Sequence, residues 1–397
     1  MFLSSLVQAT PSKIVFLIID GLGGLPHPKS GRTELETAHT PNLDSLAAQG
    51  SLGLTQPVGP GITPGSAPGH LALFGYDPVE LDIGRGVMEA LGVDFPMLKG
   101  DVAARGNFCT VDDQGLISDR RAGRIATEKN IELCQLLSPI SLKGGEVYIK
   151  PLKEHRFVAV FRGHGLMGEV SDSDPQKAGL PPLPVTSLST QSEATARLAN
   201  AFIAQARAKL AAHSPANMVL LRGFSQLPII PSLKERFQLH GVAIASYPMY
   251  RGLAKLMGLE TIACGSDMAE AFDSLASAFS NHNFFFLHIK EADLAGEDGD
   301  FDLKVKTIEE VDRHLPRLTA LKPEVIVVTG DHSTPAVLKG HSWHPVPLLM
   351  SSAWCRPQGE VKFGEAACAR GELGLLPATQ VMPLAMAHAL KLGKYGA

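Results

Sequence analysis

Cysteine is scarce in this chain, and its spacing excludes most of the sites that cysteine builds. The 397 residues contain five cysteines, which are Cys109, Cys134, Cys264, Cys355 and Cys368. None of them forms a Cys-x-x-Cys pair, which argues against a zinc ribbon or a thiol redox motif. An odd number of scattered cysteines is typical of a protein whose thiols stay reduced, so we expect a cytoplasmic location.

The chain also lacks a long apolar run and an excess of charge. No stretch approaches the roughly 18 consecutive apolar residues of a membrane span. The first residues, MFLSSLVQATPSK, have no basic segment before their apolar part, so they do not predict a signal peptide. The net charge of −4 gives no electrostatic case for nucleic acid or an anionic membrane. We expect neither partner, and the sequence does not predict the oligomeric state.

The densest group of candidate ligands follows one short apolar run. Residues 325–328 read VIVV, a β-branched composition that predicts a buried strand. Asp331 and His332 come almost directly after it, and His341 and His344 follow within a loop. Open α/β sheets bind their ligands at the carboxyl ends of their strands. A polar loop with surface histidines is the plain alternative, but the clustering favours a metal or catalytic site.

Two further apolar runs end in the same way. Residues 14–19, IVFLII, precede Asp20, and residues 284–289, FFFLHI, come shortly before Asp293. Strands such as these alternate with helical patterns, which predicts an α/β fold with a mostly parallel sheet and helices on both faces. Because the carboxyl ends of parallel strands meet at one edge, we expect these acids to lie together with Asp331.

The side chains expected at that edge suit a divalent metal. They are Asp20, Asp293, Glu297, Asp331, His332 and His341. Oxygen and nitrogen donors in this mixture favour Mn²⁺, Zn²⁺, Co²⁺ or Mg²⁺ over a metal that needs thiolates. Two metals about 4 Å apart can bind a phosphoryl group and activate a nucleophile.

Ser66 is the candidate nucleophile. It stands in a loop rich in Gly and Pro, residues 55–68, just before a possible helix that begins at Ala67. As the N-cap of that helix, the serine would lie where the helix dipole favours an anion. The residues alone leave two readings open, a plain helix cap and a nucleophile.

The character of the chain changes near Asp101, where short strand patterns and turns begin. We therefore expect a smaller α+β domain at residues 99–240, inserted between two parts of a core domain at residues 1–98 and 241–397. Within the insertion, Asp119, Arg120, Arg121 and Arg124 form a tight basic cluster. It is either a solvated turn or a site where arginines bind carboxylate and phosphate in bidentate geometry.

Short motifs along the whole chain match one known family. They are Ile18-Ile19-Asp20-Gly21, Thr40-Pro41-Asn42-Leu43-Asp44, Thr63-Pro64-Gly65-Ser66-Ala67, Gly69-His70, Gly84-Arg85-Gly86, Asp119-Arg120-Arg121-Ala122-Gly123-Arg124-Ile125, His288-Ile289-Lys290, Gly330-Asp331-His332-Ser333-Thr334, and His341-Ser342 with Pro345-Val346-Pro347. In their order and number, the chain resembles the cofactor-independent phosphoglycerate mutases of the archaeal type, within the alkaline phosphatase superfamily. The resemblance implies an alkaline-phosphatase-like core that carries metals and an inserted domain that handles substrate.

The resemblance also implies roles for single residues. Ser66 looks like the nucleophile that becomes phosphorylated. The implied ligands of one metal are Asp20, Ser66, Asp331 and His332, and those of the other include Asp293 and His341. Glu297 stands where the family has a histidine, since its Asp-x-x-x-His stretch reads DLAGE here. Two divalent ions are implied, with Mn²⁺ or Mg²⁺ favoured and Zn²⁺ or Co²⁺ as alternatives.

For the substrate, the resemblance points to the Asp119–Arg124 cluster. The weaker candidates for the same role, with an ordinary surface or hinge role as the alternative, are His164, Arg251, Lys255 and Lys290. The expected reaction interconverts 2-phosphoglycerate and 3-phosphoglycerate through a phosphoserine. A metal-dependent phosphohydrolase or phosphotransferase that acts on another small phosphorylated metabolite is the second hypothesis. A protein that only binds such a metabolite is the third.

Overall fold

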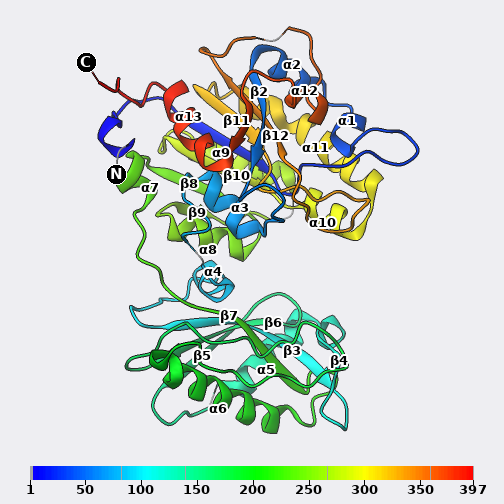
Figure 1. Cartoon of the computed structure of the whole chain (residues 1–397), viewed down its shortest axis with the longest axis vertical. Helices are drawn as coiled ribbons and strands as arrows, with labels where there is room; N and C mark the ends of the chain where they lie inside the picture. The colour runs from blue at the N-terminus through cyan, green and yellow to red at the C-terminus, as the bar shows by residue number, and fades with distance from the viewer. Residues whose placement is uncertain (1–2, 82, 139, 266, 358, 397) are drawn as a thin grey trace. The chain divides into compact units, whose positions relative to one another are not determined.

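The chain folds into two compact units (Figure 1). The computed structural model describes residues 3–81, 83–138, 140–265, 267–357 and 359–396. The core unit comprises Met1–Asp82, Pro231–Tyr247 and Met257–Ala397, and the second unit comprises Ile83–Ile230 and Pro248–Leu256. Relative to the boundaries expected from the sequence, this division moves residues 83–98 and 248–256 to the second unit and residues 231–240 to the core unit.

An eight-stranded sheet organises the described part of the core unit. Its strand order is β13-β2-β12-β11-β1-β10-β8-β9. Strand β12 runs antiparallel to both of its neighbours, and every other adjacent pair is parallel. The predicted α/β fold with a mostly parallel sheet is therefore confirmed. The strands are β1 (Ile14–Ile19), β2 (Ser51–Gln56), β8 (Gly241–Ile244), β9 (Glu260–Ile262), β10 (Phe284–Ile289), β11 (Val325–Thr329), β12 (Val346–Ser352) and β13 (Gly374–Pro377).

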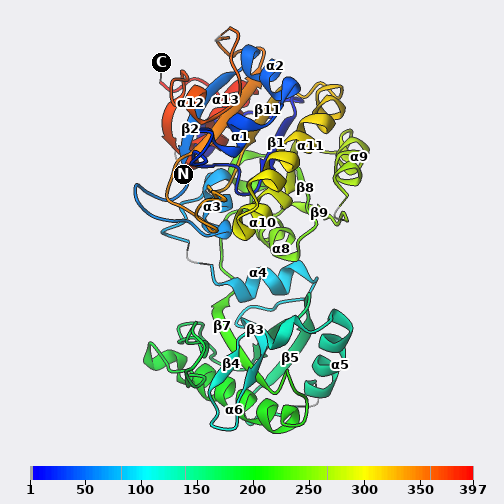
Figure 2. The same cartoon turned by 90° about the vertical axis from the view of Figure 1, so that its right-hand side faces the viewer.

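Helices cover both faces of this sheet (Figure 2). Alternate side chains of β1, such as Val15 and Leu17, join a cluster with buried residues of α2, α9 and α11. On the opposite face, Phe74 at the end of α3 packs edge-on against Phe286, with ring centroids 5.1 Å apart. Burying one such side chain contributes about 1.5–3 kcal/mol. The helices of the core unit are α1 (Glu34–Thr37), α2 (Pro41–Gln49), α3 (Ser66–Leu73), α7 (Leu233–Phe237), α9 (Met268–Ala278), α10 (Glu291–Asp298), α11 (Phe301–Thr319), α12 (Glu365–Cys368) and α13 (Val381–His388).

The second unit is built on an antiparallel sheet, coloured cyan to green in Figure 1. Its order is β4-β3-β6-β5, and β7 also pairs with β3. On one face, Phe161 contacts Phe202 of α6 with ring centroids 6.0 Å apart, and on the other Val158 joins Val87 of α4. The elements are β3 (Val102–Val111), β4 (Ile117–Asp119), β5 (Glu146–Pro151), β6 (Arg156–Arg162), β7 (Met218–Gln226), α4 (Arg85–Gly92), α5 (Thr127–Leu137), α6 (Glu193–Leu210) and α8 (Pro248–Leu256).

Local signals set several helix ends. Helix α2 has Pro41 at its first position and ends before Gly50, as Pro and Gly favour. Helix α3 corrects one expectation, because its N-cap is Gly65 and Ser66 is its first helical residue. Gly65 holds the extended backbone that a cap requires, with φ −84° and ψ 166°. Among the described residues, no helix combines the length and the apolar composition of a membrane span.

Candidate metal centre and anion site

The carboxyl ends of three neighbouring parallel strands bring the predicted acids together. Asp20 follows β1, Asp331 follows β11, and Asp293 lies in the first turn of α10 after β10. All three carboxylates are buried. Gly21 makes this possible, because its φ is +68° and a Cβ there would lie 2.7 Å from Oγ1 of Thr334 and 2.9 Å from Oδ1 of Asp293.

The first ligand group surrounds Nε2 of His332. This nitrogen lies 3.4 Å from Oδ1 of Asp20, 3.1 Å from Oδ2 of Asp331 and 3.2 Å from Oγ of Ser66. Oδ1 of Asp20 is buried and has no hydrogen-bond partner among the described residues. A buried carboxylate oxygen without a donor is destabilising, and a bound cation would remove that penalty. The residues therefore fit a divalent ion.

A second ligand group lies on the other side of the same imidazole. Oδ1 of Asp293 is 3.9 Å from Nδ1 of His332 and 3.5 Å from Nε2 of His341. His341 uses Nδ1 for a 2.9 Å hydrogen bond to the carbonyl oxygen of Pro64, which leaves the lone pair of Nε2 for a metal. The hydroxyl of Thr334 donates to Oδ1 of Asp293 over 2.6 Å and fixes the carboxylate.

Glu297 lies at the rim of this second group. Its Oε1 is 3.8 Å from Nε2 of His341, and its side chain is 51% exposed. Helix α10 places it one turn after Asp293, on the same side of the helix. The carboxylate can therefore reach the neighbourhood of the site from the solvent side, and its role as a metal ligand stays a prediction.

Neighbouring groups keep the pKa values of Asp20 and Asp331 low. Burial alone would raise the pKa of Asp20, but Lys290, His288 and His332 hold that pKa well below its usual range. Burial and the charge of Asp20 would raise the pKa of Asp331, yet the neighbouring histidines lower it. Nζ of Lys290 lies 3.1 Å from Oδ2 of Asp20 and also bonds Asp293. Lys290 thus lies with the predicted metal ligands of the core unit.

Sequence reasoning gave no role to two histidines that complete the site. Nδ1 of His70 lies 2.7 Å from the carbonyl oxygen of Ser66 and 3.1 Å from Oδ2 of Asp331. Nε2 of His288 lies 3.1 Å from Oδ2 of Asp20. Their positions in the sequence could have identified both as site residues, since His70 stands one helical turn after Ser66 and His288 is the penultimate residue of β10.

Ser66 presents its hydroxyl to the first ligand group. Helix α3 can bring it there because Gly69 lies against the loop after β11, where a Cβ would be 2.2 Å from the carbonyl oxygen of Asp331. The amino end of this eight-residue helix faces the acids and His332. A serine hydroxyl beside a metal group and a helix N-terminus is well placed to carry a phosphoryl group.

The basic cluster of the second unit is a constrained loop. Asp119 accepts hydrogen bonds from the backbone N–H of Arg121 over 2.8 Å and of Gly123 over 2.6 Å. Ala122, Gly123 and Arg124 have φ angles of +46°, +62° and +52°. Such angles are unfavourable for residues other than glycine and persist where the surroundings impose them, often at functional sites.

The three arginines of the cluster differ in what they bind. Arg120 makes a bidentate pair with Asp174, with distances of 3.0 and 2.7 Å, so its guanidinium is already occupied. Arg121 and Arg124 are exposed, and neither side chain forms an ion pair within the described ranges. Two of the three predicted arginines are therefore available to an anion.

The neighbourhood of this loop is strongly positive. Burial lowers the pKa of His155, and the charges of Arg156, Arg105, Arg121 and Arg124 lower it further, to about 3. Three arginines that the sequence analysis did not single out as site residues contribute to this charge, and they are Arg85, Arg105 and Arg222. They come from α4, β3 and β7, so only the fold shows their proximity.

The remaining substrate candidates do not join the loop. His164 is exposed, in the turn after β6. Nζ of Lys255 donates to the carbonyl oxygen of Leu91 over 3.1 Å, and Nη2 of Arg251 donates to that of Gly92 over 3.3 Å. These bonds tie α8 to the end of α4, and a substrate role for the three residues stays a prediction.

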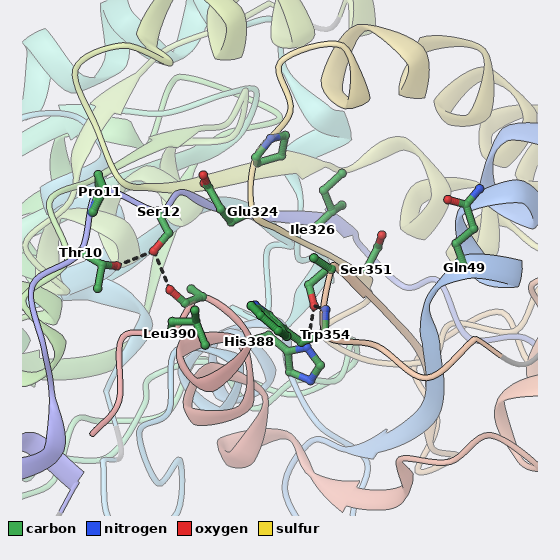
Figure 3. Close-up of a pocket in the computed structure, with 14 residues that line it drawn as sticks. Thr10, Pro11, Ser12, Gln49, Glu324, Ile326, Ser351, Trp354, His388 and Leu390 are labelled. Atoms are coloured by element: carbon green, nitrogen blue, oxygen red, sulfur yellow. Dashed lines mark hydrogen bonds between the residues drawn. The ribbon is translucent and has the colours of Figure 1, made fainter. Parts of the chain in front are cut away.

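A cavity of about 600 Å³ lies elsewhere in the core unit (Figure 3). Glu324, just before β11, and Ser352, at the end of β12, line it together with His388. Ser352 pairs with Val325, the first residue of β11, whereas Asp331 follows the last residue of that strand. The cavity therefore lies at the opposite end of β11 from Asp331. This cavity is not part of the metal centre.

The chain is similar to proteins of one family. The model of the family described as 2,3-bisphosphoglycerate-independent phosphoglycerate mutase matches residues 47–217. A probable 2,3-bisphosphoglycerate-independent phosphoglycerate mutase of Thermotoga neapolitana is 50% identical, over 100% of this chain and 98% of that protein. One from Thermus thermophilus is 48% identical at the same coverages. The solved cofactor-independent phosphoglycerate mutase of Thermoplasma acidophilum is 31% identical, with a TM-score of 0.72, over 95% of this chain and 100% of that one.

Proposed function

The chain belongs to the 2,3-bisphosphoglycerate-independent phosphoglycerate mutases, and we propose that its reaction proceeds through a phosphoserine on Ser66. The observation that carries this proposal is the position of the serine hydroxyl. It lies 3.2 Å from Nε2 of His332, at the amino end of α3, beside buried acids that fit a metal. We take the reaction to interconvert 2-phosphoglycerate and 3-phosphoglycerate.

Two divalent ions would complete the site. Asp20, Asp331 and His332, with the oxygen of Ser66, would hold one of them. Asp293 and His341, with Glu297 at the rim, would hold the other. Such ions act as Lewis acids and lower the pKa of a bound hydroxyl. The carboxylate-rich donor set favours Mn²⁺ or Mg²⁺, with Zn²⁺ and Co²⁺ as alternatives.

The chain's own residues account for the covalent steps. Oγ of Ser66 attacks the phosphorus, loses its proton, and the bond between phosphorus and the glycerate oxygen breaks. The freed glycerate takes up a proton on that oxygen. The other hydroxyl of glycerate then attacks the phosphoserine, loses its proton, and Ser66 recovers its own. The N–H groups at the start of α3 and the ammonium of Lys290 favour the phosphoryl charge.

Substrate recognition belongs to the arginine loop in this proposal. Phosphoglycerate carries a carboxylate and a phosphate, and a guanidinium binds either group through two parallel hydrogen bonds. Arg121 and Arg124 are supported as anchors because both are exposed and unpaired in the described structure. Asp119 and Arg120 hold the loop in place. A cytoplasmic location is proposed as well, since the five cysteines form no disulfide.

A phosphohydrolase is the second candidate. Glu297 is 51% exposed, so water reaches the rim of the metal group, and water that attacks a phosphoserine releases free phosphate. Purified protein with 3-phosphoglycerate and Mn²⁺ separates the two outcomes when 2-phosphoglycerate and free phosphate are both followed. We expect 2-phosphoglycerate with little phosphate. Release of phosphate without 2-phosphoglycerate would establish the hydrolase instead.

A further inference from the structure

We propose that His240, Glu260 and His282 form a second divalent-cation site in the core unit, of the zinc class, separate from the catalytic metals. The three residues stand at the amino-terminal starts of neighbouring strands, just before β8, at the start of β9 and just before β10. The catalytic acids follow the carboxyl ends of the strands. The length of β10, six residues, separates the starts of these strands from their carboxyl ends by about 20 Å.

The distances match a coordination sphere. Nε2 of His282 lies 3.2 Å from Oε2 of Glu260, and Nε2 of His240 lies 3.6 Å from Oε1 of the same carboxylate. One atom from each residue falls within 4.8 Å of the others. Ligands about 2.0–2.1 Å from a tetrahedral zinc are about 3.3 Å apart, so these separations leave room for one ion.

His282 supplies the independent observation that points to a ligand. Its side chain is only 8% exposed, and its Nδ1 lies 3.1 Å from the carbonyl oxygen of Ala278. A carbonyl only accepts, so the proton must be on Nδ1, and the neutral ring then has a lone pair on Nε2. That buried nitrogen has no hydrogen-bond partner in the described structure and faces the carboxylate of Glu260. An acceptor facing an acceptor requires a cation or a proton between them.

The second imidazole favours a metal over a proton. Each oxygen of Glu260 faces one Nε2, and without a metal His282 would have to carry a second proton on its buried Nε2. The rings of His240 and His282 are nearly parallel, at 15°, with centroids 5.1 Å apart. A buried imidazolium at His282 would lose its hydration, whereas one divalent ion satisfies all three ligands at once. Nearby Lys13 bonds the carbonyl oxygens of Phe279 and His282 rather than Glu260.

The donor set identifies the class of metal. Two neutral imidazoles and one carboxylate are the ligands of zinc sites that keep a fourth position for water, and Ni²⁺ and Cu²⁺ accept the same set. A bound ion would join the starts of three strands. One of these is β9, a three-residue strand at the edge of the sheet. The site would therefore stabilise an edge that short pairing alone holds weakly.

Counting zinc per chain tests the proposal. His240→Ala and Glu260→Gln remove ligands that are 55% and 64% exposed, so neither change disturbs the core. His39→Ala, an exposed histidine of the same unit outside the cluster, is the matched control. Each protein is dialysed to equilibrium against the same free zinc concentration, and bound zinc is measured by elemental analysis. The catalytic ligands are intact in all of them.

We expect both ligand variants to bind one zinc equivalent fewer than the wild type and His39→Ala. Zinc should also raise the unfolding temperature of the wild type and of His39→Ala more than that of the two ligand variants, because a ligand that binds only the folded state stabilises it. Equal zinc content in all four proteins would overturn the proposal and leave the cluster as a protonated ion pair. Because mutase activity plays no part in this measurement, its result is independent of the proposed reaction.

Discussion

A buried carboxylate such as that of Asp20 stays ionised only because neighbouring groups stabilise its charge. Its position at the end of an apolar strand is visible in the sequence, and so were those of Asp293 and Asp331. Two groups that keep Asp20 ionised, His288 and Lys290, come from the end of β10, 268 and 270 residues further along the chain. Their effect on its pKa depends on distances of about 3 Å, which no spacing rule supplies.

The arginine loop yields a first prediction at this scale. Arg121→Lys and Arg124→Lys should each lower kcat/KM by about tenfold, since lysine cannot reproduce the bidentate guanidinium contact. Arg207→Lys, an exposed arginine on α6, is the matched control and should leave kcat/KM unchanged. Steady-state kinetics with 3-phosphoglycerate decides the matter. Wild-type kinetics in both loop variants would show that the loop is a surface turn that does not bind the substrate.

Glu297 yields a second prediction. A carboxylate makes its metal a weaker Lewis acid than an imidazole does and favours harder ions, so the wild type should prefer Mn²⁺ or Mg²⁺ over Zn²⁺ at the Asp293/His341 group. Glu297→His should shift that preference towards Zn²⁺ and raise mutase efficiency. Metal content and rates across a metal series measure both effects.

Asp298→His serves as the control for Glu297→His, because Asp298 is the next acid on α10. It adds the same imidazole to the same helix on a different side from His341. If Glu297→His changes neither the metal preference nor the rates, Glu297 is no ligand of the metal centre.

Helix α11 stabilises the loops beside the candidate metal centre through one buried cation. Nζ of Lys304 donates to the carbonyl oxygens of Gly23, at 3.0 Å, and Thr334, at 2.8 Å. Its counter-ion is Glu34 of α1, 3.9 Å away, which also accepts from the backbone N–H of Ala336. Burial lowers the pKa of Lys304, and the charge of Glu34 opposes that shift. Two helices thus fix the loop that carries Thr334.

Lys304→Met should lower the free energy of unfolding by about 3–5 kcal/mol, because it leaves Glu34 as a buried charge without its partner. Lys306→Met, at an exposed position two residues further along α11, should change it by less than about 0.5 kcal/mol. Urea denaturation of both variants measures the difference. Equal stabilities would show that the pair does not hold the loop.

Elements with a strong pattern of their own were predicted with accurate bounds. The runs IVFLII and FFFLHI coincide with β1 and β10, and the predicted run VIVV extends by only one residue in β11. Strands β9 and β13 were not predicted from the sequence. Their three or four residues are too few to show an alternation of apolar and polar residues, and these strands form only by pairing with a neighbouring strand. The helical pattern at residues 305–315 predicts a shorter helix than α11, because Asp300 caps the helix earlier and Pro316 is tolerated near its end.

At the scale of the whole chain, one rule connected distant segments. Ile14 pairs in register with Val325 on one side and with Phe284 on the other. The sequence pattern does not contain these pairings, but it does show that each of these strands ends near an acid. Parallel strands place such ends at a single edge, which is why the grouping of the acids could be predicted, while the proximity of Arg85, Arg105 and Arg222 in the second unit could not.

The central claim is that Ser66 carries the phosphoryl group. Wild type, Ser66→Ala and the control Ser30→Ala, an exposed loop serine, should be compared with 3-phosphoglycerate and Mn²⁺. Formation of 2-phosphoglycerate is followed, and mass spectrometry of quenched protein locates any phosphoserine. We expect Ser66→Ala to keep the wild-type unfolding temperature, form no 2-phosphoglycerate and carry no phosphoryl group, while Ser30→Ala behaves as wild type. Substantial turnover by Ser66→Ala, or a phosphoryl group trapped on another residue, would contradict the claim.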